Sequence, residues 1–353
     1  MSEAYLARIA TATPEHEVHG AFLQYAHGML KEERSRTLLL RMAERAGIER
    51  RYSVLSVNGS NEASATDAYR FYEPGAFPST AQRMHMYKQS APSLMRRALD
   101  RLALSEDERS RIRHVIVTTC TGFYAPGLDF EIVDALGLHP DVERTVIGFM
   151  GCYAAINALK QARHIVRSNP EHTVLVLNLE LCTLHLQETQ NLGEVLSFLI
   201  FGDGCAASLI TGTPTGLLLE SFKAVRLQDT ADLITWKIGD QGFDMVLSGQ
   251  VPAAVGTALR EHRSSLATAD EVQHWAVHPG GRSVLDAVQE ALTLPPHALS
   301  HSRRVLRDYG NMSSATVMFV LQSILQASAP GEKGIAMSFG PGLTAETMRF
   351  VAV

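Results

Sequence analysis

The first hundred residues have the spacing of apolar and charged positions that is typical of helices. In residues 31–52, leucine and methionine recur among charged residues, and Gly47 then provides a helix stop. Residues 78–104 have the same spacing but contain Pro92, which disfavours an uninterrupted helix. We therefore predict one helix that ends near Gly47 and two further helices that are separated near Pro92.

From residue 114 onward, short β-branched runs alternate with helical segments, and this order is typical of parallel α/β units. Residues 226–256 mix glycine, aspartate and aromatic residues with apolar ones, which favours a hairpin or an extended arm. The second half then repeats the order of elements of the first. The strands expected in the first half are 114–120, 173–180 and 206–211, and their counterparts are 274–281, 334–342 and 347–353.

This repeated order predicts an α/β protein with two similar halves, residues 1–215 and 216–353. The helices that begin at Cys152 and at Asn311 occupy equivalent places in the two halves. If the halves pack together, both helix starts face one shared cleft. The prediction depends on the order of elements, because few residues are identical between the halves.

The composition is that of a globular protein, with 46% hydrophobic and 20% charged residues among 353. A net charge of -5 argues against a general nucleic-acid binder, whose surface is usually basic. No run of about 18 apolar residues occurs, so no membrane span is expected. The N-terminal residues are charged early and lack the apolar stretch of a secretory signal, which predicts a cytoplasmic protein.

The four cysteines, Cys120, Cys152, Cys182 and Cys205, stand far apart and near no metal-type histidine spacing, so neither zinc nor disulfides are predicted. Cys152 differs from the others because it follows Gly151, where a short apolar strand turns into a helix. Unpaired peptide N–H groups at a helix start acidify a thiol, and a nearby imidazole adds to this effect. Cys152 is therefore either a small buried hydrophobe or an activated nucleophile.

Two polar residues could complete a site with Cys152. His278 ends an apolar strand before a glycine turn, where its side chain can face a cleft. Asn311 begins a helix, and its carboxamide could donate a hydrogen bond to a thioester carbonyl or to the enolate formed from it. Each has an ordinary alternative, since strand-end histidines are often structural and asparagines often cap helices. Their joint placement at strand-to-helix junctions favours a chemical role.

Five segments carry a resemblance to a known family. They are GFMGCYAA (148–155), FGDGCAASLI (201–210), HPGG (278–281), YGNMSSATV (309–317) and SFGPGLTAET (338–347). With them the chain resembles the type III polyketide synthases, the chalcone-synthase-like members of the thiolase superfamily, over nearly its whole length. Condensing enzymes that initiate fatty-acid synthesis share the Cys, His and Asn but lack a close match to the last segment. The resemblance implies duplicated βαβαβ halves that form a five-layered αβαβα core.

The resemblance also implies an acyltransferase without a metal or a cofactor, whose substrates are acyl-CoA and malonyl-CoA. Cys152 would attack an acyl-CoA starter, His278 would keep the thiol ionised, and His278 with Asn311 would bind the malonyl thioester carbonyl. Decarboxylation of malonyl-CoA would yield an enolate that attacks the acyl-enzyme and extends the chain. Repeated rounds and a cyclisation would give a pyrone or a phenolic ring.

Further residues match positions that the family uses for its substrates. Phe201 and Phe243 correspond to its gatekeeping phenylalanines, although Phe201 could also be a core residue. His185 would narrow the cavity or bond the growing chain, and a structural histidine is the alternative. The residues that match the cavity lining are Cys120, Thr121, Cys182 and His185, and those that match CoA-binding residues, or form a solvated face, are Arg41 and Arg45.

The segment LELCTLHLQ (179–187) resembles bacterial members that take aliphatic acyl starters, which favours alkylpyrone or alkylresorcinol products. The family also implies a homodimer, in which Ala125, before Pro126, would reach into the partner's cavity. Two other functions remain open at this point. One is a single-step β-ketoacyl synthase of the type that initiates fatty-acid synthesis, and the other is a thiolase-fold partner subunit without catalysis.

Overall fold

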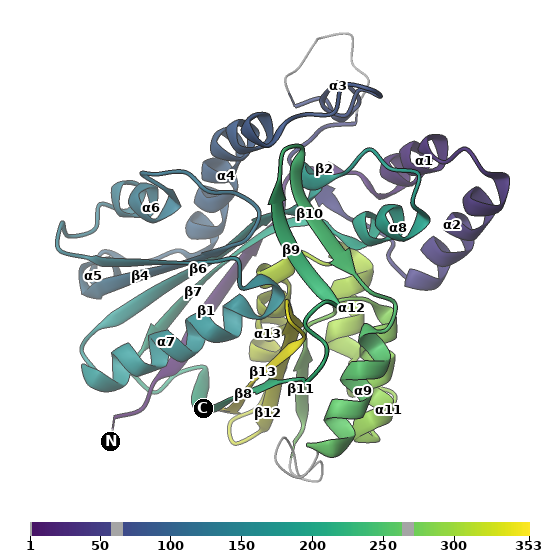
Figure 1. Ribbon diagram of the computed structural model, residues 1–353. Helices are drawn as coiled ribbons and strands as arrows, with labels where there is room; N and C mark the ends of the chain where they lie inside the picture. The colour runs from purple at the N-terminus through teal and green to yellow at the C-terminus, as the bar shows by residue number, and fades with distance from the viewer. Residues whose placement is uncertain (1, 58–65, 263–271) are drawn as a thin grey trace.

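A computed structural model describes residues 2–57, 66–262 and 272–353 of the chain. Within these residues the main feature is a nine-stranded mixed sheet (Figure 1). Its strands in spatial order are β11 (His274–Val277), β12 (Lys333–Gly340), β13 (Thr344–Ala352), β8 (Leu217–Arg226), β1 (Tyr5–Ala12), β7 (Asp203–Thr211), β6 (Thr173–Leu181), β4 (Ile112–Thr119) and β5 (Glu143–Gly148).

The sheet consists of two halves with the same topology. In the first, β4 is parallel to β6, β6 antiparallel to β7, and β7 antiparallel to β1. In the second, β11, β12, β13 and β8 repeat this order and these directions. The halves join where β1 meets β8, through the pairs Tyr5–Leu218 and Leu6–Leu217. The duplication predicted from the order of elements is therefore confirmed.

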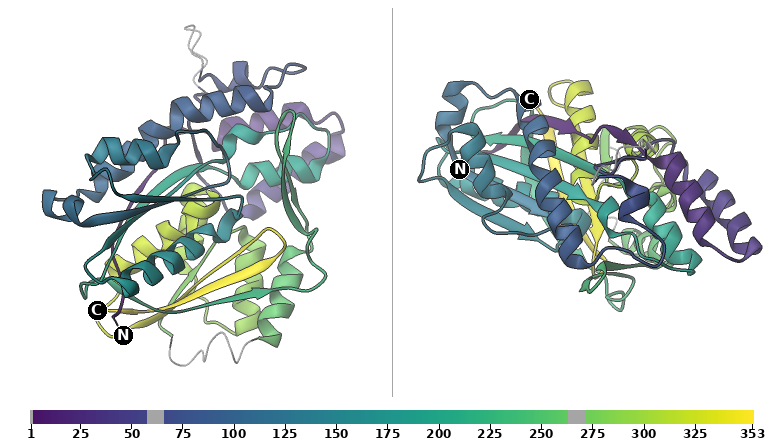
Figure 2. Two further views of the ribbon diagram at one scale, coloured as in Figure 1. Left: turned by 60° about the vertical axis from the view of Figure 1, so that its left-hand side comes forward. Right: turned by 90° about the horizontal axis from the view of Figure 1, so that it is seen from above.

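Helices separate and cover the two halves of the sheet. Between the halves lie α7 (Ala154–Ser168) and α13 (Thr316–Ala327), as Figures 1 and 2 show. The first half is covered on its outer face by α4 (Thr80–Leu102) and α6 (Leu128–Leu136). The outer helices of the second half are α9 (Val251–Glu261), α11 (Arg282–Leu292) and α12 (Ser300–Tyr309). This order of layers is the predicted αβαβα core.

The strand β6 shows why the sequence of such strands is continuously apolar. All nine of its residues are buried, because helices cover both faces of the sheet. Val174 and Val176 belong to the core between the two halves, whereas Leu175 and Leu177 belong to the outer core under α4. Burial on both faces leaves no place for the polar alternation of a half-exposed strand.

Smaller elements surround one end of the sheet. The helix α2 (Glu33–Ala46) ends at Gly47, whose φ of 67° is left-handed, as predicted from the sequence. The segment 226–256 contains the predicted hairpin, formed by β9 (Ile234–Gly239) and β10 (Gly242–Leu247). The other elements are α1 (His19–Met29), α3 (Ala68–Phe71), α5 (Glu106–Arg111), α8 (Leu192–Ile200), β2 (His16–Glu17) and β3 (Tyr52–Ser53).

Two predictions about the first hundred residues were wrong. Residues 80–102 form the single helix α4, with Pro92 inside it. Its buried face continues on both sides of the proline, from Tyr87 and Ala91 to Leu94 and Met95, and this packing outweighs the loss of one backbone hydrogen bond. The strand β1 was not predicted, although it lies in the middle of the sheet. The predicted boundary between residues 215 and 216 falls between β7 and β8 and remains a prediction.

Candidate active site

Cys152 lies in a tight turn between β5 and α7. The turn is a short 3₁₀ helix, Gly151–Tyr153, that leads directly into α7. Gly151 has φ 67°, and a Cβ atom there would come within 2.4 Å of Cδ of Pro341. Only glycine fits both the left-handed backbone and this close approach. The half-buried thiol of Cys152 is thereby presented at a helix start, as the sequence predicted.

Asn311 occupies the equivalent turn of the second half. It is 2% exposed and precedes the 3₁₀ helix Ser313–Ala315, which leads into α13. Its Oδ1 accepts a hydrogen bond of 2.9 Å from the N–H of Ser313, and its Nδ2 lies 3.4 Å from the carbonyl oxygen of Gly280. These two bonds orient the amide and leave the second N–H of Nδ2 to donate to a ligand.

His278 follows β11 and is 1% exposed. Its backbone N–H donates to the carbonyl of Met337 in β12 at 2.8 Å, which continues the sheet pairing by one residue. In the described part of the chain, neither ring nitrogen has a hydrogen-bond partner. Burial lowers the pKa of the imidazole to about 3, so it is neutral at physiological pH. A neutral imidazole with a free nitrogen can accept a proton.

Burial also controls the protonation of Cys152. It raises the pKa of the thiol to about 12, although hydrogen bonding with Ser313 and Asn311 lowers it in part. The ionised thiol that the family resemblance implies stays a prediction. Burial favours the neutral forms of both groups, because a neutral His278 supplies no positive charge to balance a thiolate in a buried site.

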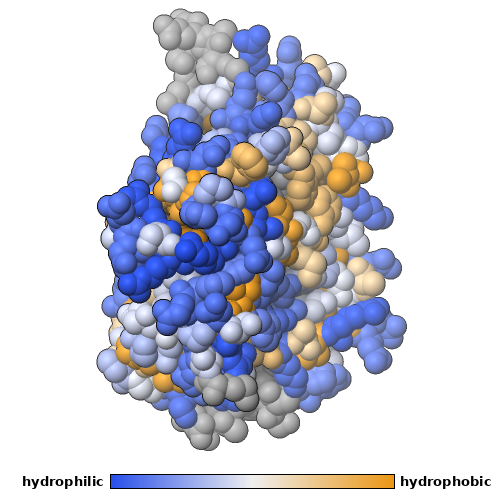
Figure 3. Space-filling view, turned by 90° about the vertical axis from the view of Figure 1, so that its left-hand side faces the viewer, coloured by the Kyte–Doolittle hydropathy of each residue, from blue (hydrophilic) through white to orange (hydrophobic). Residues whose placement is uncertain are grey.

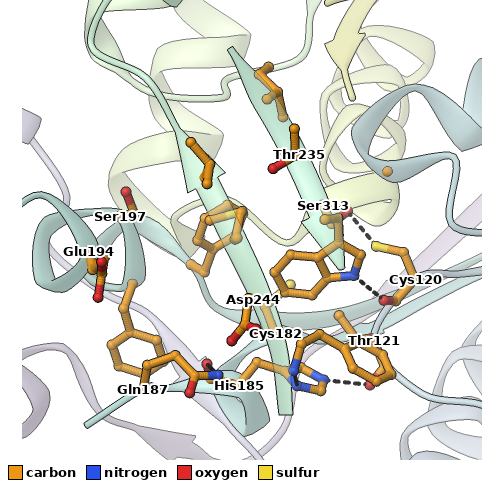
Figure 4. A pocket seen from close by; sticks show the side chains of 18 of the residues that line it. Cys120, Thr121, Cys182, His185, Gln187, Glu194, Ser197, Thr235, Asp244 and Ser313 are labelled. Atoms are coloured by element: carbon orange, nitrogen blue, oxygen red, sulfur yellow. Dashed lines mark hydrogen bonds between the residues drawn. The ribbon is translucent and has the colours of Figure 1, made fainter. Parts of the chain in front are cut away.

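Ser313 links the nucleophile to a second thiol, a contact that the sequence analysis missed. Its Oγ lies 3.8 Å from Sγ of Cys152 and 3.2 Å from Sγ of Cys120, as Figure 4 shows for Cys120. The backbone of Ser313 has φ 46°, so the turn that carries it is strained. Its position two residues after Asn311 was the only signal in the sequence.

Glu180 lies under this site and was also missed. It is fully buried at the end of β6. Its oxygens accept hydrogen bonds from the hydroxyls of Ser314 (2.6 Å) and Thr121 (2.8 Å) and from the N–H of Cys120 (2.9 Å). Burial raises the pKa of this carboxyl to about 7. An acidic residue within a mostly apolar strand is the sequence signal that could have identified Glu180 as part of the site.

A cavity of about 370 Å³ opens beside the thiol of Cys152. Figure 4 shows the polar side chains that face it from η2 (Cys182–His185), from α8 and from the hairpin. Every residue predicted to line the cavity of the chain itself does so: Cys120, Thr121, Cys182, His185, Phe201 and Phe243. Trp236, Ser313 and Pro341 line it as well, whereas His278 and Asn311 are buried and are not among the lining residues.

His185 is a neutral part of the cavity wall. Its Nδ1 accepts a hydrogen bond of 3.1 Å from the N–H of Phe243, so its Nε2 carries the proton that is donated to the carbonyl of Thr121 at 2.7 Å. The imidazole stacks on the ring of Phe243, with centroids 4.3 Å apart. Burial lowers its pKa to about 3. Because both nitrogens are bonded to the protein, His185 narrows the cavity and has no free atom for a growing chain.

The remaining predicted residues lie on the surface. Arg41 and Arg45 share one exposed face of α2, and no ion pair engages either within the described residues. Arg282, which sequence reasoning missed, donates a hydrogen bond of 3.2 Å to the carbonyl of Arg45, so this end of α2 lies close to the turn after His278. Ala125 is exposed on the loop after β4, outside the cavity of its own chain.

Comparisons with known proteins show the family to which the chain belongs. Residues 2–214 match the family model described as chalcone and stilbene synthases, N-terminal domain, and residues 219–353 match the C-terminal domain of the same family. The chain is 33% identical to the alpha-pyrone synthesis polyketide synthase-like Pks18 of Mycobacterium tuberculosis, over 77% of this chain and 74% of that protein. It is 30% identical to 1,3,6,8-tetrahydroxynaphthalene synthase of Streptomyces peucetius, over 97% and 91%.

Solved structures show the same relationship. The structure is similar to that of PKS-I from the brown alga Ectocarpus siliculosus, with a TM-score of 0.89, 30% identity and coverage of 100% and 99% of the two chains. It is also similar to tetrahydroxynaphthalene synthase of Streptomyces coelicolor, with a TM-score of 0.84, 28% identity and coverage of 98% and 99%. The chain therefore belongs to the chalcone and stilbene synthase family of type III polyketide synthases, acyltransferase-type condensing enzymes that act on CoA thioesters.

Proposed function

We propose that Cys152 carries the acyl chain and that His278 and Asn311 activate the extender unit. The neutral His278 takes the proton of the Cys152 thiol as the sulfur attacks the carbonyl of an acyl-CoA starter. The thioester bond to CoA breaks, and CoA leaves as a thiol after it receives that proton. The observation that carries this role is a buried imidazole with no hydrogen-bond partner in the described chain, whereas both ring nitrogens of His185 in the cavity wall are bonded to the protein.

The extension step uses the two donors on malonyl-CoA. The amide N–H of Asn311 and the N–H of the neutral His278 ring bind the thioester carbonyl of malonyl-CoA, where negative charge develops. The bond to the carboxylate breaks, carbon dioxide leaves, and its electron pair forms an enolate. The enolate carbon attacks the acyl carbonyl on Cys152, and the sulfur leaves as a thiolate, which regains its proton from solvent. The extended chain, now on CoA, returns to Cys152 for the next round.

We propose an aliphatic starter and a pyrone or resorcinol product. The cavity wall supports this choice, since it is formed largely by apolar side chains, among them Leu186, Phe198, Ile234, Met245 and Val246. The name of the Mycobacterium relative refers to alpha-pyrone synthesis, which fits a product of this kind. Ring closure within the chain needs room to fold, and a cavity of about 370 Å³ favours short products over long ones.

CoA and a second copy of the chain are the proposed partners, and neither a metal nor another cofactor is needed. Arg41 and Arg45 would meet CoA phosphates, because their guanidinium groups are exposed on one face of α2. A homodimer is favoured by an apolar surface over α6, β5 and the adjoining loops, part of the side that Figure 3 shows. Its exposed apolar residues are Phe123, Phe130, Val146 and Met150.

An assay with a panel of acyl-CoA starters and labelled malonyl-CoA tests the proposal. We expect products that contain several malonyl-derived units, which separates iterative extension from a single β-ketoacyl condensation. Replacement Cys152→Ala should abolish products, and Asn311→Ala should lower malonyl-CoA decarboxylation by about a hundredfold. Full activity of Cys152→Ala, or products with one extension only, would contradict the assignment.

A further inference from the structure

Arg51 is a buried cation next to the candidate active site and outside its cavity. It is fully buried, in the segment after α2. Its Nη1 donates to the carbonyl of Phe201 at 2.6 Å and lies 3.4 Å from the carbonyl of Phe198, and its Nε donates to Nδ1 of His19 at 3.0 Å. A guanidinium buried in this way is costly, so its hydrogen bonds must hold specific groups in place.

Arg51 binds the carbonyl of Phe201, which belongs to the junction between the segments around Phe201 and Asn311. Phe201 and Asn311 form an isolated parallel bridge, in which the N–H of Asn311 donates to Ile200 at 2.8 Å and the N–H of Gly202 donates to Asn311 at 2.9 Å. The bridge joins the end of α8 to the turn before α13. Any shift of the Phe201 carbonyl therefore moves the backbone of Asn311 as well.

The aliphatic part of Arg51 supports the other side of the same junction. Gly310, which precedes Asn311, has φ 67°, and a Cβ atom there would lie 2.9 Å from Cγ of Arg51 and 2.7 Å from the carbonyl of Ile200. Arg51 is thus packed against the backbone before Asn311 while its guanidinium binds the backbone of Phe201. One side chain contacts both strands of the bridge.

We propose that Arg51 is a positioning residue that holds the amide of Asn311 and the ring of Phe201 in register as one unit. The inference rests on the roles proposed above for Asn311 in binding the malonyl carbonyl and for Phe201 at the cavity. The planar guanidinium is needed because its two N–H groups reach His19 and Phe201 in fixed directions. A lysine keeps the charge and much of the volume, but it is a single point donor and cannot hold both partners.

Replacement Arg51→Lys tests the proposal through two partial reactions of the whole enzyme. Acylation of Cys152 by an acyl-CoA starter does not use Asn311, so its rate should change less than about twofold. Decarboxylation of malonyl-CoA uses the Asn311 amide, so its rate should fall about tenfold or more. A shift of Phe201 should also change the distribution of product lengths, measured by mass.

Arg83 provides a matched control. It too is fully buried, donates from Nη1 to a backbone carbonyl, that of Leu184, at 2.6 Å, and has an Nη2 without a partner in the described chain, as Arg51 has. It makes no contact with the bridge that holds Asn311. Arg83→Lys should therefore lower the melting temperature as Arg51→Lys does, but leave the ratio of decarboxylation to acylation unchanged.

A milder variant keeps the test decisive if Arg51→Lys does not fold. His19→Ala removes the acceptor of Nε at a half-buried position, so we expect the same change in the ratio of the two rates, about threefold in size. A ratio equal to that of the wild type in the folded Arg51 or His19 variant overturns the proposal. If Asn311→Ala did not lower the rate of malonyl-CoA decarboxylation, the proposed function would be refuted instead. The two failures are therefore distinguishable.

Discussion

Two histidines in the site are both buried and neutral, yet their surroundings give them different capacities. His185 is bonded at both ring nitrogens, whereas His278 has no partner at either within the described residues. An imidazole whose two nitrogens are both hydrogen-bonded to the protein, as in His185, is fixed in one tautomer and can only shape the cavity. A free one can accept a proton from Cys152 and later donate it. At the scale of residues, the hydrogen bonds thus decide which histidine is available for chemistry.

The rate at which iodoacetamide alkylates Cys152 should depend on pH in a way that reports its protonation. With a pKa near 12 for Cys152 and near 3 for His278, the thiol is protonated at neutral pH, and the rate should rise steadily between pH 6 and 9. The measurement is the loss of free Cys152 by mass spectrometry, with the buried Cys205 as the internal control. A rate that is flat from pH 6 upward would show that an ionised pair forms instead.

Glu180→Gln should stabilise the protein more at pH 8 than at pH 5. The folded pKa of Glu180, about 7, lies above the ordinary value of 4.5, so the folded state holds a proton that the unfolded chain releases. Stability of the wild type therefore falls as the pH rises from about 4.5 to 7. The gain from glutamine at pH 8, on the order of 2 kcal/mol, is measured by urea unfolding. An equal change at both pH values would contradict the raised pKa.

At the scale of elements, the hairpin β9–β10 is tied to the cavity by side chains from distant segments. The indole N–H of Trp236 donates to the carbonyl of Cys120 at 2.7 Å, and the N–H of Phe243 donates to His185 at 3.1 Å. A two-stranded hairpin alone is marginally stable, so these bonds hold it against the cavity. The hairpin and the place of its Phe243 at the cavity were predicted from the sequence, but the hydrogen bonds that hold it there were not.

Trp236→Phe should loosen the hairpin and admit larger chains. The replacement keeps an aromatic ring but removes the hydrogen bond to Cys120, which is worth about 1 kcal/mol. Phenylalanine is also smaller than tryptophan, so the cavity becomes wider. We expect a shift toward longer starters or an additional extension, detected in the masses of the products. Lys237→Ala is the matched control, since Lys237 is the next residue and is exposed. An identical product distribution for both variants would argue against a role of Trp236 in setting cavity size.

At the scale of the whole molecule, the strand order leaves one apolar edge. The edge strand β5 leads to the turn of Cys152, and Val146 within it is 47% exposed. Phe130 on α6 is 45% exposed on the neighbouring element. Apolar side chains at a sheet edge usually mark an interface, since an uncovered edge would promote aggregation. No helix among the described residues is long and apolar enough to cross a bilayer.

Val146→Asp should dissociate the proposed homodimer. A carboxylate in the middle of an apolar interface would be buried without a partner, which costs several kcal/mol in association. Light scattering coupled to size exclusion should give a dimer for the wild type and a monomer for the variant. Ile238→Asp serves as the control, because Ile238 is 63% exposed and lies on the hairpin rather than on β5 or α6. A monomeric wild type at micromolar concentration, or a dimeric Val146→Asp, would refute the interface.

The sequence alone determined the class of fold and the identity of the family. The two halves were visible because the same order of apolar segments occurs twice along the chain. Strands that helices cover on both faces are mostly apolar, so each one stands out in the sequence. The turns with Cys152, His278 and Asn311 were visible because glycines and motif residues stand next to them. The strands β1 and β8 and the uninterrupted α4 were not predicted, since the two strands lie outside the repeated runs and an interior proline is tolerated when packing continues around it.

The tertiary structure alone decided what the side chains of the site can do. Whether Cys152 is ionised depends on burial, and burial depends on segments that come together only in the fold. His185 is bonded to Thr121 and Phe243, which are 64 and 58 residues away, and Arg51 is bonded to Phe201, 150 residues away. Protonation and orientation arise from such distant contacts, so a sequence names the chemical groups while the fold sets their state.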